Sequence, residues 1–191
     1  MSIPLPVDRM PEAEAALRLA FFLLGSPGCA PEIEVNMDGA QVSVGKKTIF
    51  PVREFLLDSG WQLVTPIGSR DWQGIYQNGV RRIIVRSQTA LGDVIAKVGN
   101  HRLRAECKKG PLKQSKGSKE YKALWEAIGQ LVATEHVGHQ DILIGAVPLT
   151  DTFAKLVENW RRRPLVVQSG IKFLMVGRNG DVRGCESLGI E

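Results

Sequence analysis

Asp93, Glu106 and Lys108 are of the residue types that a metal-dependent phosphodiesterase needs. A divalent cation such as Mg²⁺ prefers oxygen ligands and keeps several of its waters, so two carboxylates and one backbone carbonyl suffice as protein ligands. Asp93, Glu106 and the carbonyl of Cys107 are the candidate ligands. Lys108 would hold its ammonium beside the metal, where it can position or help deprotonate water and offset the charge of a phosphate.

A predicted β-hairpin positions these residues. Residues 91–98 and 101–108 form its strands, and Gly99-Asn100 between them suits a tight two-residue turn. Because side chains alternate along a strand, the acid of the first strand and the Glu-x-Lys triplet of the second share the polar face. The thiol of Cys107 falls on the apolar face without a His partner, so we interpret it as a core group rather than a nucleophile.

The alternative interpretation of the triplet is a salt-bridged polar strand face without catalysis. The same spacing recurs at Glu120-Tyr121-Lys122, within a predicted helix. Only the triplet 106–108 lies on a predicted strand, and only this copy has an acid in the strand before it. These two differences favour a functional site at the hairpin.

Further elements are predicted on both sides of the hairpin. Helices are expected at 11–24, at 51–59, after Ser118 as N-cap, and after Thr150 or Asp151 as N-cap. Strands are expected at 61–65, 81–86 and 141–147, a second hairpin at 32–44 around Asp38-Gly39, and one or two strands over 166–176.

The segment GDVIAKVGNHRLRAECKKG, residues 92–110, resembles motifs II and III of the PD-(D/E)xK nuclease superfamily. The resemblance extends over roughly 51–147 and is interrupted by an insertion at 66–90. It implies an α/β fold with a mixed sheet and a restriction endonuclease-like αβββαβ core. Residues 51–191 would form this nuclease-like domain, and residues 1–50 would pack on it as a helix and hairpin extension.

The resemblance also implies roles for individual residues. Asp93 and Glu106 would be the metal carboxylates and Lys108 the catalytic lysine, with Gly92 standing where the motif name has proline. Glu54 would match the first-helix acid that many members add to the metal shell. Glu12 or Glu14 would take that role if 11–24 is the core helix instead.

Gln130 resembles a second-helix glutamine that lies near the site in some members of the superfamily, and a surface amide is the alternative. The implied cofactor is Mg²⁺, with Mn²⁺ as a substitute. The implied activity is that of a Mg²⁺-dependent deoxyribonuclease.

The charge of the chain agrees with a polyanionic partner such as DNA. Its 191 residues carry a formal net charge of +5, and the pI is about 9.3. A loop after the hairpin contains candidate backbone-binding lysines, for which plain solvation is the alternative. They are Lys109, Lys113, Lys116 and Lys119.

Composition sets further expectations. Three cysteines without paired spacing favour a reducing, cytoplasmic location, and no apolar run is long enough to cross a membrane. Two other functions stay open beside the nuclease: a catalytically inactive nucleic-acid-binding module with the same fold, and a structural or assembly protein that forms a homodimer.

Overall fold

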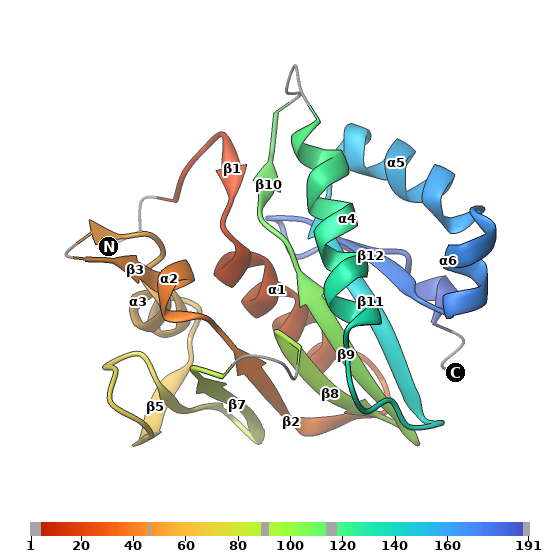
Figure 1. The fold of residues 1–191 in the computed structure, drawn as a ribbon. Coiled ribbons are helices and arrows are strands. Elements are labelled where there is room, and N and C mark those ends of the chain that lie inside the picture. The colour runs from red at the N-terminus through yellow and green to blue at the C-terminus, as the bar shows by residue number, and fades with distance from the viewer. Residues whose placement is uncertain (1–4, 46, 89–91, 114–117, 189–191) are drawn as a thin grey trace.

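A large mixed sheet forms the centre of the molecule in this computed structural model, which describes residues 5–45, 47–88, 92–113 and 118–188 (Figure 1). Its strands are β2 (Cys29–Asn36), β5 (Gln62–Pro66), β6 (Gly74–Asn78), β7 (Arg81–Arg86), β8 (Val94–Val98), β9 (His101–Cys107), β11 (Asp141–Pro148), β12 (Lys172–Val176) and β13 (Val182–Arg183). Their order in the sheet is β13-β12-β11-β9-β8-β2-β7-β6-β5. The predicted mixed α/β class is therefore confirmed.

Helices cover both faces of this sheet. The helix α1 packs on one face over one hydrophobic cluster, and α4 and α5 pack on the other face and share a second cluster. The helices are α1 (Glu12–Gly25), α2 (Gly39–Val42), α3 (Val52–Asp58), α4 (Lys119–Val132), α5 (Asp151–Arg161), α6 (Pro164–Ser169) and the 3₁₀ turn η1 (Cys185–Ser187). Two short antiparallel pairs lie outside the sheet: β1 (Arg9–Met10) with β10 (Gly110–Pro111), and β3 (Ser43–Val44) with β4 (Lys47–Thr48).

The predicted hairpin is present as β8 and β9, which pair antiparallel from Val94↔Ala105 to Val98↔His101. Gly99 has φ +56° in the turn, a conformation that glycine adopts without steric cost. On the outer sides of the hairpin, β2 pairs with β8 and β11 pairs in parallel with β9. The hairpin therefore lies inside the sheet, where both of its strands are fixed by two neighbours.

The predicted hairpin at 32–44 is wrong. Its first half is a strand, β2, but the chain then enters α2 instead of returning. The Asp38 side chain accepts a hydrogen bond from the Ala40 N–H at 3.0 Å, so Asp38 caps a helix rather than forming a two-residue turn. The partners of β2 are β7 and β8, which makes it a central strand.

The strand prediction over 166–176 is correct only for its second half, β12. Residues before it form α6, which has Pro164 in its first turn and ends at Gly170 with φ +70°. Proline at a helix start and glycine just past its end are the usual signals of a short helix.

The remaining predicted elements correspond to α1, α3, α4, α5, β5, β7 and β11. Thr150 caps α5 by accepting from the Phe153 N–H at 3.2 Å, whereas the Ser118 side chain makes no capping hydrogen bond to α4. Two strands of the segment 66–90, β6 and β7, belong to the main sheet. Within the described residues, no helix is long and apolar enough to cross a membrane.

Candidate active site

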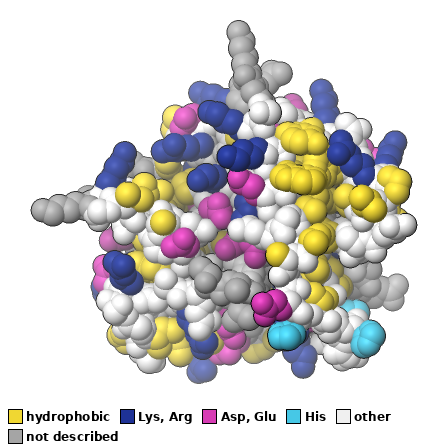
Figure 2. Space-filling model, viewed as in Figure 1, with side chains coloured by type: hydrophobic (Ala, Val, Ile, Leu, Met, Phe, Trp, Pro, Cys, Tyr) yellow, Lys and Arg dark blue, Asp and Glu magenta, His cyan; other side chains and the backbone are white. Residues whose placement is uncertain are grey.

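A cleft of about 580 Å³ opens at one end of the β8–β9 hairpin. Figure 2 shows acidic side chains gathered in the middle of this face, with Lys and Arg side chains above them. The walls of the cleft come from the hairpin, the start of α1, α2 and the C-terminal end of α4. The lining residues used below are Glu12, Gln41, Asp93, Arg104, Glu106, Lys108, Gln130 and Glu135.

Asp93 enters the cleft from the residue just before β8. Val94 and Ala96 are buried against α1, and strand alternation sends Asp93 to the other face, as predicted. The Cys107 N–H donates to Asp93 Oδ2 at 2.7 Å, which ties the acid to β9. Gly92 before it has φ +97°, a value that the proline ring cannot reach, so the departure from the motif name has a backbone cause.

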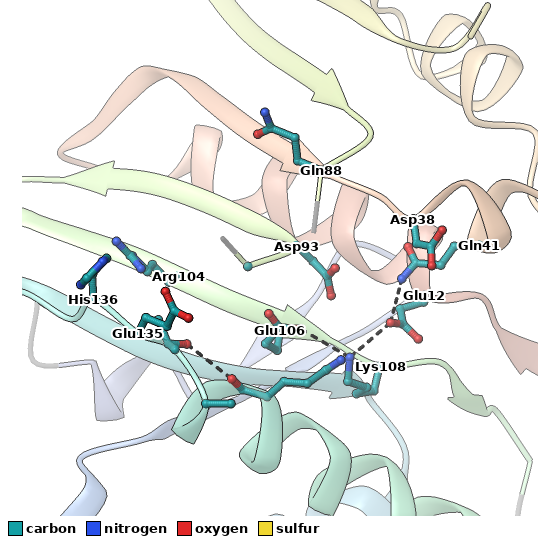
Figure 3. Close-up of a pocket in the computed structure, with 14 residues that line it drawn as sticks. Glu12, Asp38, Gln41, Gln88, Asp93, Arg104, Glu106, Lys108, Glu135 and His136 are labelled. Atoms are coloured by element: carbon teal, nitrogen blue, oxygen red, sulfur yellow. Dashed lines mark hydrogen bonds and ion pairs between the residues drawn. The ribbon is translucent and has the colours of Figure 1, made fainter. Parts of the chain in front are cut away.

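Glu106 and Lys108 line the same cleft from β9 and the residue after it (Figure 3). Lys108 is 4% exposed, and its backbone N–H continues the ladder to β11 by donating to Ala146 O at 2.8 Å. Its Nζ lies 3.0 Å from the Cys107 carbonyl oxygen and 3.5 Å from Glu106 Oε2. The structure therefore brings Asp93, Glu106, Lys108 and the Cys107 carbonyl together.

Glu12 supplies a third acid to the cleft. Its Oε1 accepts from Lys108 Nζ at 3.2 Å and from Gln41 Nε2 at 2.9 Å. Glu12 is the first residue of α1, and α1 precedes β2, the strand that pairs with β8. This position in the chain brings the N-terminus of α1 to the end of the hairpin.

Glu54 is not part of this cleft, so its assignment as a metal ligand is corrected. It is exposed on α3, which leads into β5 at the far edge of the sheet. Of the two alternatives on the first helix, Glu12 is the one that reaches the cleft. Glu14 is fully buried and pairs instead with Arg18 and Arg178, at 2.8 Å and 2.7 Å.

The carboxyl groups of the site are held in an unfavourable electrostatic setting. Burial raises the pKa of Asp93, the nearby Glu106 raises it further, and Lys108 offsets part of this rise. Burial also raises the pKa of Glu106, against the opposing effect of Lys108. One ammonium therefore does not compensate the acids of the cleft.

Lys108 itself is stabilised as a cation. Burial acts to lower the pKa of Lys108, but Glu12, Asp93 and Glu106 together outweigh burial and raise it. The side chain is therefore protonated at neutral pH. In this arrangement it provides positive charge rather than a basic nitrogen.

The oxygen donors of the cleft are of the type that a hard divalent cation prefers, but they do not form a complete set of preformed metal ligands. Within the described residues, no three His, Cys, Asp or Glu side chains converge as a set of metal ligands. Two carboxylates and the Cys107 carbonyl remain, and Mg²⁺ commonly binds with so few protein ligands and keeps its waters. The excess of buried negative charge at Asp93 and Glu106 is what a divalent cation would neutralise.

The other predicted site residues have different outcomes. Gln130 lines the cleft from α4, whereas Lys109, Lys113 and Lys119 are exposed and do not line it. Lys116 lies outside the described residues. The thiol of Cys107 is fully buried in the core, and burial raises its pKa well above the ordinary value, so the prediction that it is not a nucleophile agrees with its setting.

The lining residues that were not predicted as site residues include Arg104, Gln41 and Glu135. Arg104 carries a local signal, because it shares the strand face of Glu106. Gln41 and Glu135 carry none, since they reach the cleft only through the packing of α2 and the end of α4 against the hairpin.

No protein-family model, no curated protein and no solved structure matches this chain.

Proposed function

We propose that this protein is a Mg²⁺-dependent nuclease of the PD-(D/E)xK type, which hydrolyses phosphodiester bonds of DNA. The observation that carries the proposal is the convergence of Asp93, Glu106, Lys108 and the Cys107 carbonyl in one acidic cleft. The sequence alone does not require this convergence. Asp93, Glu106 and Lys108 lie on two strands, and three such polar residues can equally well face solvent.

The order of elements supports the same proposal. The sequence α1, β2, β8, β9, α4, β11 follows the αβββαβ order of the restriction endonuclease-like core, with the other elements inserted or appended. The site lies at the hairpin of the two middle strands, where that superfamily has its metal. The core helix in this account is α1 and the inserted segment is 37–91, a longer insertion than the sequence suggested.

The chemistry follows from the charges. A bound Mg²⁺ supplies Lewis acidity and lowers the pKa of water. Asp93, Glu106 and the Cys107 carbonyl would hold the ion, and Lys108 would direct its ammonium to the phosphate. During hydrolysis the water oxygen bonds to phosphorus as the bond to the leaving sugar oxygen breaks, and the water proton balances the leaving oxygen. Extra negative charge on the phosphate oxygens is then offset by the cation of Lys108.

A cleavage assay with isosteric variants tests the proposal. Purified protein with Mg²⁺ or Mn²⁺ is expected to cut DNA, and Asp93→Asn, Glu106→Gln and Lys108→Met are each expected to abolish cutting. Glu54→Gln is the matched control, because it removes an exposed acid outside the cleft. Undiminished cutting by all three cleft variants would rule the proposal out.

A second candidate is a nucleic-acid-binding module without catalysis. The ion pairs of Lys108 with Glu12 and Glu106 favour it, because they balance part of the acidic charge without a metal. Calorimetric titration separates the two candidates. The nuclease should bind Mg²⁺ in a manner that Asp93→Asn abolishes, whereas the module should bind DNA without any dependence on Mg²⁺.

A further inference from the structure

Arg104 is a buried cation in the cleft to which the proposed hydrolysis assigns no role. It lies on β9 two residues before Glu106, and its side chain is only 9% exposed. Figure 3 shows it near Glu135 and His136, away from Glu12 and Lys108. Its Nε is buried and makes no hydrogen bond within the described residues.

The nearest anion does not satisfy Arg104. Asp141 Oδ2 lies 3.4 Å from Arg104 Nε, as a charge contact without a hydrogen bond. Both Asp141 oxygens are engaged elsewhere: Arg102 donates to them at 2.6 Å and 2.8 Å, and the Gly138 N–H donates at 2.9 Å. A buried donor left without an acceptor is costly, so Asp141 leaves the guanidinium incompletely satisfied, and an oxygen ligand in the cleft would meet its terminal nitrogens.

Glu135, the acid beside Arg104 at this end of the cleft, does not satisfy the guanidinium either. Glu135 lines the cleft with an exposed side chain, and it forms no ion pair within the described part of the chain. A carboxylate that stays in water while a guanidinium lies buried next to it leaves the N–H fork open toward the cleft.

We propose that Arg104 forms a phosphate-binding subsite, which holds the substrate phosphate adjacent to the one that is cleaved. This inference rests on the proposed nuclease function. A strand advances 3.3–3.4 Å per residue, so Arg104 and Glu106 are separated by about 7 Å along β9. Arg104, Glu106 and Lys108 therefore form a line on one strand face, along which consecutive phosphates of one nucleic-acid strand can lie.

The guanidinium suits this role better than the exposed lysines do. Its planar fork donates two parallel N–H bonds to phosphate oxygens, and burial reduces competition from water. Phosphate contacts fix the register of a nucleic acid without reading its sequence. Arg104 would therefore position the scissile phosphate over Glu106 whatever the bases are.

A salt titration of DNA binding tests the subsite. The probe is a short fluorescent DNA, single-stranded or duplex, and the background is Asp93→Asn so that the DNA stays intact. Arg104→Gln is expected to weaken binding by about 5- to 30-fold and to reduce the slope of log K against log salt by about 0.7 to 0.9. Arg104→Lys is expected to keep the slope and lose part of the affinity, because it keeps the charge without the fork.

Arg102→Gln is the matched control, since Arg102 lies on the same strand face and pairs with Asp141, but does not line the cleft. It is expected to leave affinity and slope unchanged, and thermal melts verify that each variant is folded. Equal losses in Arg102→Gln and Arg104→Gln, or no loss in Arg104→Gln and Arg104→Lys, would refute the subsite. If only Arg104 matters but the wild-type protein never cuts DNA, the subsite stands and the nuclease proposal fails.

Discussion

Replacing Lys108 with methionine removes the only ammonium that the described residues place among the acids of the cleft. Lys108 Nζ contacts the Cys107 carbonyl, Glu12 and Glu106 at 3.0, 3.2 and 3.5 Å, and the side chain is 5% exposed. Breaking a buried ion pair from one side costs about 3–5 kcal/mol. Methionine keeps most of the apolar stem, and Gln41 still donates to Glu12. We therefore expect Lys108→Met to lower the free energy of unfolding by an amount near the lower end of this range, about 3 kcal/mol at pH 8.

The loss of unfolding free energy in Lys108→Met should be larger at pH 8 than at pH 5. The pKa of Lys108 is raised, so its stabilising charge is present throughout the neutral range and is lost only above the ordinary lysine range. The pKa values of Asp93 and Glu106 are raised as well, so these acids take up protons on mild acidification. The uncompensated charge then disappears, and the expected loss at pH 5 is about 1 kcal/mol.

Urea unfolding with a chelator present measures both values. Lys109→Met is the matched control, because Lys109 is the exposed neighbour outside the cleft. It is expected to change the free energy of unfolding by less than about 0.5 kcal/mol. Two results would refute this electrostatic description of the site. One is a free energy of unfolding for Lys108→Met within 1 kcal/mol of the wild-type value at pH 8, and the other is an equal loss at both pH values.

Three further predictions concern the supports of the site. Glu12→Gln is expected to lower the rate of DNA cleavage by about 10- to 100-fold, because Glu12 holds Lys108. Glu54→Gln should cleave as wild type does. Equal rates of both variants in a DNA-cutting assay would contradict the role of α1. Gly92→Ala is expected to cost about 1–2 kcal/mol in urea unfolding, since Gly92 has φ +97°, and a cost below 0.5 kcal/mol would argue against this backbone constraint. Arg178→Met is expected to cost about 2–4 kcal/mol in the same measurement, because it leaves the fully buried Glu14 with Arg18 alone; no shift of the urea midpoint would show that Arg18 suffices.

The parts of the site that could be predicted from the sequence depend on local rules. Strand alternation and a Gly-Asn turn are enough to place Asp93, Glu106 and Lys108 on one face of a hairpin. These rules act over a few residues, and neighbouring strands do not change them. The same alternation also places Arg104 on that face, although its burial in the cleft could not be foreseen.

The parts that were missed depend on which distant segments pair. Glu54 and Glu12 both lie in the first turn of a helix that precedes a strand, and only the partner of β8 decides which helix reaches the cleft. That partner is β2, for which the sequence predicts a separate hairpin, because Asp38-Gly39 has the composition of a tight turn. The Asp38 side chain instead satisfies a backbone N–H at the start of α2, an outcome that composition alone does not distinguish.

The most direct measurement is DNA cleavage by the wild-type protein in ¹⁸O-labelled water with added Mg²⁺, with the products analysed by mass. We predict one ¹⁸O in the new terminal phosphate of each cut, no cutting with a chelator, and no cutting by Asp93→Asn or Glu106→Gln. Intact DNA at every Mg²⁺ and Mn²⁺ concentration, or labelled products formed equally by the two variants, would contradict this prediction.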